Sequence, residues 1–174
     1  MGLLVLLSSV DPALDPLTQH ISEASRASGW LATADKVLPV IAGLSIVLFG
    51  FGCFFRLRHW WWTGTAGLLF DAAMIANGVF PAGDPRHGLY GLALFSVLVP
   101  ACYGAEFSGP FSPRFVQFSL FCTGAGMAYM WMLLIGLDRD AWRALTQRLA
   151  SLLAFSWYAV TAWQYRENTL AERQ

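Results

Sequence analysis

Asp71 is the residue whose position most directly suggests chemistry. It lies at the centre of residues 60–80, a run of mostly apolar and small side chains. A charge at the centre of a bilayer costs at least about 2.5 kcal/mol, and no Lys, Arg or His lies at the same depth in the other apolar runs. We therefore expect Asp71 to be neutral at pH 7. A neutral carboxyl group can donate a hydrogen bond, or deliver or relay a proton.

Two interpretations of Asp71 remain open. Either it donates protons in a functional site, or it hydrogen-bonds to a neighbouring helix and only holds the fold together. Gly64, Gly67 and Gly78 are spaced to share its helical face, and small residues let another helix approach, so the carboxyl group should point into the protein. The expected partners are hydroxyl groups near the middle of the other runs, from Ser45, Ser96, Thr123 and Ser156.

The turn after this run carries a second pair of candidate groups. In residues 80–88, FPAGDPRHG, Asp84 and His87 are three residues apart, between prolines and glycines that favour tight turns. Such a pair can act as acid and base, or join His20, Glu23 and Asp15 in a metal site; alternatively both are solvated turn residues. We assign Asp71, Asp84 and His87 as the catalytic candidates and assign no metal site. The polar residues assigned to substrate binding are Asn77, Glu23, Ser22 and Ser96.

Five apolar runs must position these side chains: residues 37–55, 60–80, 88–105, 115–137 and 149–165. Each is near the length of about 20 residues that a helix needs to cross a bilayer, and the alternation of a barrel strand is absent. The predicted fold is an all-α integral membrane protein, a compact bundle of five transmembrane helices. Its short loops predict antiparallel neighbours. Residues 1–36 form an apolar and interfacial N-terminal segment, residues 37–165 the bundle, and residues 166–174 a polar tail.

Composition excludes several classes of protein. The chain is 56% hydrophobic and 13% charged with a net charge of zero, which indicates a membrane protein without a nucleic-acid partner. Cys53, Cys102 and Cys122 all lie in apolar runs and are expected to be free thiols. No phosphate-binding loop, HExxH motif or mid-membrane histidine is present, so we expect no cofactor.

Two segments resemble a known family. They are DPLTQHISEASRASGWL and GLLFDAAMIANGVFPAGDPRHG, within residues 14–105. Ile21-Ser22-Glu23, Gly29-Trp30, Phe80-Pro81, Asp84 and His87 resemble the pattern of bacterial and archaeal integral membrane proteins catalogued as domain of unknown function 998. The resemblance implies the membrane fold and brings no activity with it. The family usually has a full helix before the Ile-Ser segment, where this chain has only MGLLVLLSSV.

Three functional classes follow from the sequence. The first is an accessory or structural subunit that packs in a larger membrane complex or homo-oligomer, because the chain is small and has no catalytic signature. The second is an intramembrane enzyme that acts on a lipid or isoprenoid, with a buried Asp as proton donor. The third is a small proton or cation carrier. In each case we expect contact with membrane lipids and a multi-pass location in the cell membrane, the inner membrane of a bacterium. An internal cavity would favour the enzyme over the subunit.

Overall fold

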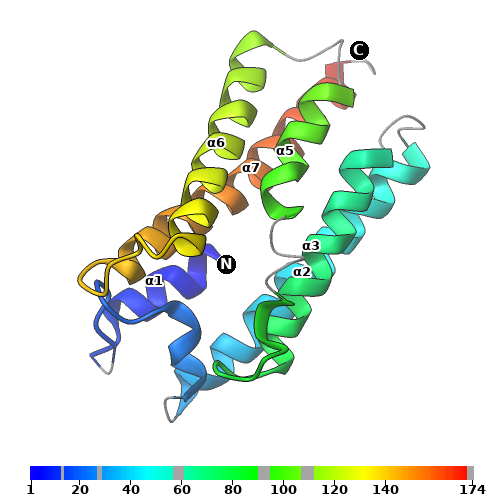
Figure 1. The fold of residues 1–174 in the computed structure, drawn as a ribbon. Helices are drawn as coiled ribbons and strands as arrows, with labels where there is room; N and C mark the ends of the chain where they lie inside the picture. The colour runs from blue at the N-terminus through cyan, green and yellow to red at the C-terminus, as the bar shows by residue number, and fades with distance from the viewer. Residues whose placement is uncertain (13, 27–28, 57–60, 90–94, 107–111, 172–174) are drawn as a thin grey trace.

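The protein is built from helices. The computed structural model describes residues 1–12, 14–26, 29–56, 61–89, 95–106 and 112–171, and within them it contains six α-helices and no strand (Figure 1). This confirms the all-α prediction. The α-helices are α1 (Gly2–Val10), α2 (Trp30–Arg56), α3 (Trp61–Val79), α5 (Phe95–Glu106), α6 (Pro113–Leu134) and α7 (Arg143–Ala171), and the short 3-10 helices are η1 (Ile21–Arg26) and η2 (His87–Leu89).

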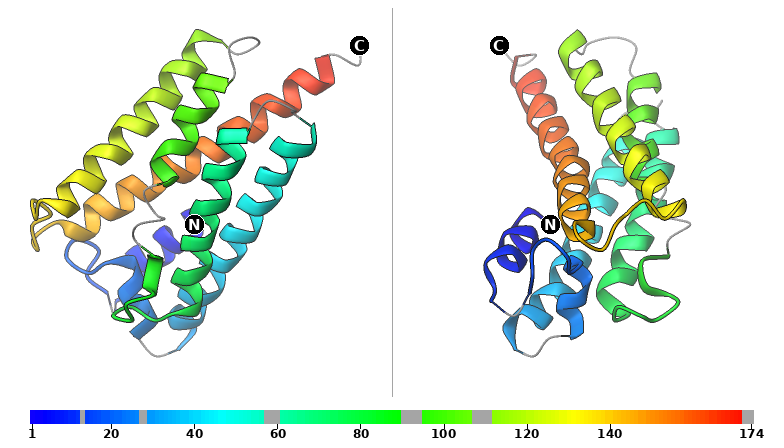
Figure 2. Two further views of the ribbon diagram at one scale, coloured as in Figure 1. Left: turned by 45° about the vertical axis from the view of Figure 1, so that its right-hand side comes forward. Right: turned by 60° about the vertical axis from the view of Figure 1, so that its left-hand side comes forward.

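Neighbouring long helices run antiparallel, as the short loops predict. Helix α3 packs along α2, α5 lies against α3 and α6, and α7 lies against α6 (Figures 1 and 2). Helix α1 contacts both α7 and α2, and it closes the side of the bundle where these two helices diverge. The cavity described below lies inside this arrangement.

Judged by length and composition, only one described helix could cross a bilayer. It is the segment Trp30–Gly52 of α2, which has a mean hydropathy of 1.8. The predicted runs at 60–80, 115–137 and 149–165 coincide with α3, α6 and α7. The run at 88–105 contains η2 and α5, and residues 90–94 between them lie outside the described part. The N-terminal apolar segment forms α1, a helix of nine residues.

Two helix starts are capped by polar side chains. Ser112 precedes α6, its Oγ accepts a hydrogen bond from the Phe115 N–H at 3.3 Å, and Pro113 occupies the first turn, where its missing N–H costs nothing. Helix α3 is capped from another helix: the Glu106 carboxylate accepts from the backbone N–H groups of Trp62 at 2.6 Å and Thr63 at 2.9 Å. Glu106 therefore anchors the end of α5 to the start of α3.

Aromatic side chains form the core between α2, α5, α6 and α7. Trp157 is fully buried, and its Nε1–H donates to Ser119 Oγ at 2.9 Å. Its ring meets Tyr103 edge-on at 5.1 Å and Phe49 at 6.0 Å between centroids. One side chain of α7 thus ties three other helices together. Cys102 and Cys122 are free thiols, as predicted, while the side chain of Cys53 lies outside the described part.

A buried arginine fastens the N-terminal segment to α7. Arg148 is only 4% exposed, and its guanidinium donates to the Ser8 carbonyl at 3.3 Å, to Ser9 Oγ at 3.2 Å and to the Gln19 carbonyl at 3.0 Å. The five N–H donors of an arginine suit such a set of oxygen acceptors. The segment before α2 is therefore packed on the bundle.

Candidate functional site

Asp71 points into the α2–α3 interface, where it meets Gly43. The residue is 7% exposed, and a Cβ atom on Gly43 would lie 2.7 Å from Asp71 Oδ1. Among the described residues, Oδ1 has no hydrogen-bond partner. The sequence-based expectation that Asp71 points into the protein beside small residues agrees with this geometry. The carboxyl group lies between closely packed helices, which leaves little room for a substrate.

The hydroxyl partner expected for Asp71 is not found in the described part of the chain. Ser45 Oγ donates to the Ile41 carbonyl at 2.8 Å, and Ser156 Oγ donates to the Leu153 carbonyl at 2.9 Å. Hydroxyl groups in helices commonly donate to a carbonyl of their own preceding turn, which removes them as donors to another helix. Thr123 Oγ1 makes no hydrogen bond to a described residue, and the side chain of Ser96 lies outside the described part.

Asp84 and His87 have separate hydrogen-bond partners. Asp84 accepts hydrogen bonds from Arg86, at 3.0 Å from Nε and 2.9 Å from Nη2, and these bonds hold the pKa of Asp84 down at about 2. Arg86 also lies over the Phe80 ring, 4.1 Å from its centroid. Gly83 adopts φ +98°, a left-handed conformation that glycine takes readily, so its predicted role in a tight turn is confirmed. Arg86 is therefore the side chain that holds the Asp84 carboxylate.

His87 turns into the protein. It is 4% exposed, and its Nδ1 lies 2.7 Å from the Phe80 carbonyl oxygen. A carbonyl only accepts hydrogen bonds, so Nδ1 carries a proton, and in the neutral form of this tautomer Nε2 is the acceptor. His87 can therefore accept a hydrogen bond from a ligand through Nε2.

A cavity of about 590 Å³ lies between the helices. Helices α2, α3, α6 and α7 form its walls, and residues of α1, η1 and η2 also line it. Its volume falls in the range of about 300–1,000 Å³ that is usual for small-molecule sites. Three predicted site residues line it, Ser22, Asn77 and His87. Asp71, Asp84 and Glu23 are not among the described residues that line it.

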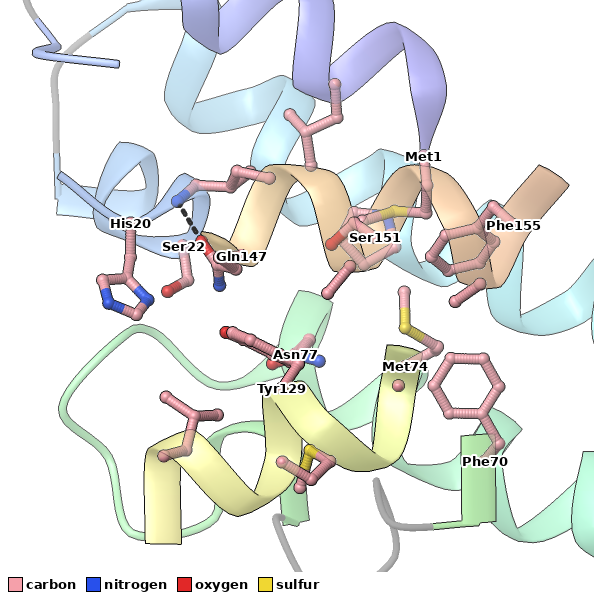
Figure 3. A pocket seen from close by; sticks show the side chains of 18 of the residues that line it. Met1, His20, Ser22, Phe70, Met74, Asn77, Tyr129, Gln147, Ser151 and Phe155 are labelled. Atoms are coloured by element: carbon pink, nitrogen blue, oxygen red, sulfur yellow. Dashed lines mark hydrogen bonds between the residues drawn. The ribbon is translucent and has the colours of Figure 1, made fainter. Parts of the chain in front are cut away.

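The lining of the cavity is divided into a polar and an apolar end. His20, Ser22 and Gln147 gather at one end, with Asn77 and Tyr129 next to them, and the rings of Phe70 and Phe155 lie at the other end with Met74 and Met1 (Figure 3). The polar residues come from η1 and from the ends of α3 and α7 near the loops, whereas Phe70, Met74 and Phe155 lie further inside their helices. The cavity thus becomes apolar towards the middle of the bundle.

Asp35 is the lining residue that the sequence analysis missed. It is 3% exposed and lies on the cavity wall in the first turns of α2, without a hydrogen bond or ion pair to any described residue. Pro39, four residues later, also lines the cavity. Proline has no N–H, so it cannot pair with the Asp35 carbonyl as the helix would otherwise require. An acid followed four residues later by a proline was the signal in the sequence, but Asp35 was assigned to the polar segment before the first span.

The segment that carries His20 and Ser22 is held in place by α7. The Glu23 carboxylate accepts a hydrogen bond from Arg143 Nη2 at 3.2 Å, and Gln147 Oε1 accepts from the Ile21 N–H at 2.8 Å (Figure 3). Burial, helped by the positive charge of Arg143, lowers the pKa of His20 from its ordinary value of 6.5, so His20 is neutral at pH 7. Glu23 therefore positions this segment and does not itself line the cavity.

The geometry does not support the metal alternative. Within the described residues, no group of three or more His, Cys, Asp or Glu side chains lies close enough to hold a metal ion. His20, Asp35 and His87 line one cavity without forming such a group. The arrangement is a cavity with hydrogen-bonding groups at one end.

Comparison with known proteins supports the family resemblance. The family described as Protein of unknown function (DUF998) matches residues 2–164, nearly the whole chain, so the match includes α1 as well as the segments noted in the sequence. No curated protein and no solved structure matches this chain. On the strength of the family match, this chain belongs to the DUF998 family.

Proposed function

We propose that this chain is a multi-pass membrane protein that binds a lipid-like amphiphile in the cavity between its helices. The observation that carries the proposal is the divided lining, with polar groups at one end and apolar side chains at the other. An amphiphile placed with its head at the polar end and its chain among Phe70, Met74 and Phe155 would satisfy both ends.

Surface composition supports a membrane location with several crossings. Large apolar side chains are exposed on the outside of α2, α3, α6 and α7, among them Leu48, Phe55, Trp62, Phe121, Trp131 and Trp163. Only 28% of the candidate span in α2 is buried, whereas a core helix of a soluble protein would be mostly buried. Exposed apolar surface of this extent suits contact with lipid.

The orientation of the cavity fits a bilayer. Its polar residues come from helix ends and from η1, which would lie near the headgroups, and its apolar residues lie deeper in the helices. A lipid in the membrane has the same arrangement, with its head at the interface and its chain in the hydrocarbon core. A lipid could therefore enter the cavity without turning over.

The cavity favours ligand binding over the other functions considered. A purely structural subunit would be expected to pack its helices without an internal cavity. A carrier would need polar access from both ends, but Figure 3 shows Phe70, Met74 and Phe155 at the end opposite His20, Ser22 and Gln147. An enzyme with Asp71 as proton donor would need Asp71 on the cavity wall, and it is not among the described lining residues.

Photolabelling tests the proposal. The full-length protein, in nanodiscs, is exposed to a photoreactive long-chain alcohol, and labelled residues are identified by mass spectrometry. We expect labelling at Met74 and Phe155. Ala154→Trp places a large side chain in the cavity and should reduce this labelling by about tenfold, the equivalent of about 1.4 kcal/mol of binding free energy.

The matched control is Leu152→Trp, on the same helix. Leu152 is 43% exposed and is not among the lining residues, so its replacement should leave the labelling of Met74 and Phe155 unchanged. Labelling confined to outward-facing residues such as Leu152, or labelling that Ala154→Trp does not reduce, would refute the proposal.

A further inference from the structure

We infer that the bound amphiphile has a protonated amine as its head and that Asp35 is the carboxylate that binds it. The inference rests on the proposed function and specifies the chemical class of its ligand. It follows from three features of the cavity wall: an unpartnered carboxylate, a surplus of acceptors, and the absence of Lys and Arg side chains among the described lining residues.

The first feature is the surroundings of the Asp35 carboxylate. A buried carboxylate is costly unless a cation or hydrogen-bond donors compensate for the lost water. The Asp35 side chain is only 3% exposed, and no described residue forms a hydrogen bond or an ion pair with its carboxylate. It nevertheless lies on the wall of a cavity large enough for a ligand. A ligand with a positive charge and N–H donors would supply the missing interactions.

The second feature is a surplus of hydrogen-bond acceptors. Pro39 leaves the Asp35 carbonyl without its usual helical N–H donor, and Nε2 is the acceptor of the neutral His87 tautomer whose Nδ1–H faces the Phe80 carbonyl. Both residues line the same cavity as the Asp35 carboxylate. A primary ammonium group carries three N–H donors and no acceptor, which suits a wall of this composition.

The third feature is charge. No Lys or Arg side chain is among the described residues that line the cavity. His20 is kept neutral at pH 7, because burial and Arg143 lower its pKa. Met1 lies at the apolar end, where burial lowers the pKa of its amino group. A phosphate or carboxylate head beside Asp35 would therefore meet its carboxyl group, and no Lys or Arg side chain among the described lining residues would pair with that head.

Competition between matched amphiphiles tests the inference. Hexadecylamine, hexadecanol and hexadecanoate have the same chain and differ in the head, and each competes with the photoreactive alcohol for the full-length protein at pH 7 in nanodiscs of zwitterionic lipid. We expect the amine to compete at least about tenfold better than the alcohol, as a charge-assisted hydrogen bond allows. The carboxylate should compete least well.

Two variants of the same protein assign the preference to Asp35. Asp35→Asn should remove the advantage of the amine and leave competition by the alcohol within about twofold. Asp71→Asn is the matched control, because Asp71 is also a buried acid of the α2–α3 pair but is not among the lining residues. It should keep the full preference for the amine.

Pro39→Ala is a second test that keeps the carboxylate. It supplies an N–H for the Asp35 carbonyl and should weaken amine binding severalfold without affecting the alcohol, and it remains informative if Asp35→Asn does not fold. Equal competition by amine and alcohol, or an amine preference that survives Asp35→Asn, would overturn the inference. If the photoreactive alcohol still labels Met74 and Phe155 in that case, the proposed function stands; without such labelling, the proposed function fails as well.

Discussion

Asp35 and Asp71 are both buried acids, but their surroundings differ. Asp71 is 7% exposed and lies against Gly43 of the neighbouring helix. Asp35 is 3% exposed and lies on the wall of the cavity. Burial makes either carboxyl group costly to ionise, but only Asp35 has adjacent space for a ligand that offsets the cost. For this reason we place the ligand at Asp35.

The protonation of His20 should make stability depend on pH. Its pKa is lowered in the folded protein, by burial first and then by Arg143, so the unfolded chain takes up the proton at a higher pH than the folded chain does. Folding stability should therefore fall as the pH drops below 6.5, the ordinary pKa. Thermal unfolding measured between about pH 7.5 and about pH 5.5 checks this expectation.

His20→Gln provides the comparison, because glutamine keeps a polar side chain that does not titrate. The melting temperature of the variant should fall less than that of the wild type over the same pH range. Asp138 lies 3.9 Å from His20 Nε2 and opposes the effect by favouring the charged ring. Identical acid sensitivity in the two proteins would show that His20 is not the group responsible.

The sequence identified some of the cavity residues and missed others for physical reasons. Ser22, Asn77 and His87 were candidates and do line the cavity. Asp35 was missed because hydropathy marks the start of a span at its first apolar residue, whereas the helix begins at Trp30. The Asp84 and His87 pair was one alternative suggested by spacing alone, and spacing cannot show that Arg86 hydrogen-bonds to the Asp84 carboxylate. The catalytic roles assigned to these residues stay predictions.

The sequence predicted the helices better than it predicted the contacts between them. Apolar runs near 20 residues in length predicted α2, α3, α6 and α7, and the short loops predicted their antiparallel order. What the sequence could not provide were contacts between distant segments. The cap of α3 comes from Glu106, more than forty residues away, and Arg148 reaches back to Ser8 across the chain. Such partners depend on the assembled fold and leave no local pattern.

The packing of α3 against α2 should depend on Gly78. A Cβ atom there would overlap the carbonyl oxygen of Lys36 and lie 2.5 Å from Val40 Cγ2. The Lys36 carbonyl belongs to the backbone of α2, so relieving this overlap requires the helix itself to shift. Gly78→Ala should force the helices apart and lower the free energy of unfolding by about 2 kcal/mol, the usual cost of overpacking. Unfolding in mixed detergent micelles measures the change.

Gly67→Ala is the matched control in the same helix. A Cβ atom at Gly67 would meet only Ile46 Cγ2, at an ordinary contact distance of 3.8 Å. The free energy of unfolding of this variant should be unchanged or rise by up to about 1 kcal/mol, because alanine has a higher helix propensity than glycine. If both variants lost the same stability, close approach at Gly78 would not be what holds the two helices together.

The whole molecule has two unlike ends. The turn after α3, η1 and the connection between α6 and α7 lie at one end, and the start of α6 lies at the other (Figures 1 and 2). The polar residues of the cavity come from the first of these ends. If the chain crosses the membrane several times, the head of a bound amphiphile would therefore lie at one defined membrane surface.

Cysteine labelling from one side of the membrane tests this arrangement. With Cys53, Cys102 and Cys122 replaced by alanine, single cysteines are introduced as Ala82→Cys, Asp140→Cys or Arg114→Cys. Ala82 follows α3 and Asp140 precedes α7, whereas Arg114 lies in the exposed first turn of α6. Ala82→Cys and Asp140→Cys should react alike with a membrane-impermeant maleimide in intact cells, and Arg114→Cys should show the opposite reactivity.

Permeabilised cells, in which all three positions should react, control for local accessibility. Helix α6 is described from Pro113 to Leu134, about 33 Å of helix at 1.5 Å per residue, enough to separate its two ends by a bilayer of about 30 Å. Opposite reactivity at Arg114 and Asp140 would therefore mean that α6 crosses the membrane, although among the described helices only α2 is long and apolar enough by length and composition. Equal reactivity at all three positions in intact cells would exclude that crossing, and the cavity would then have to be entered from water.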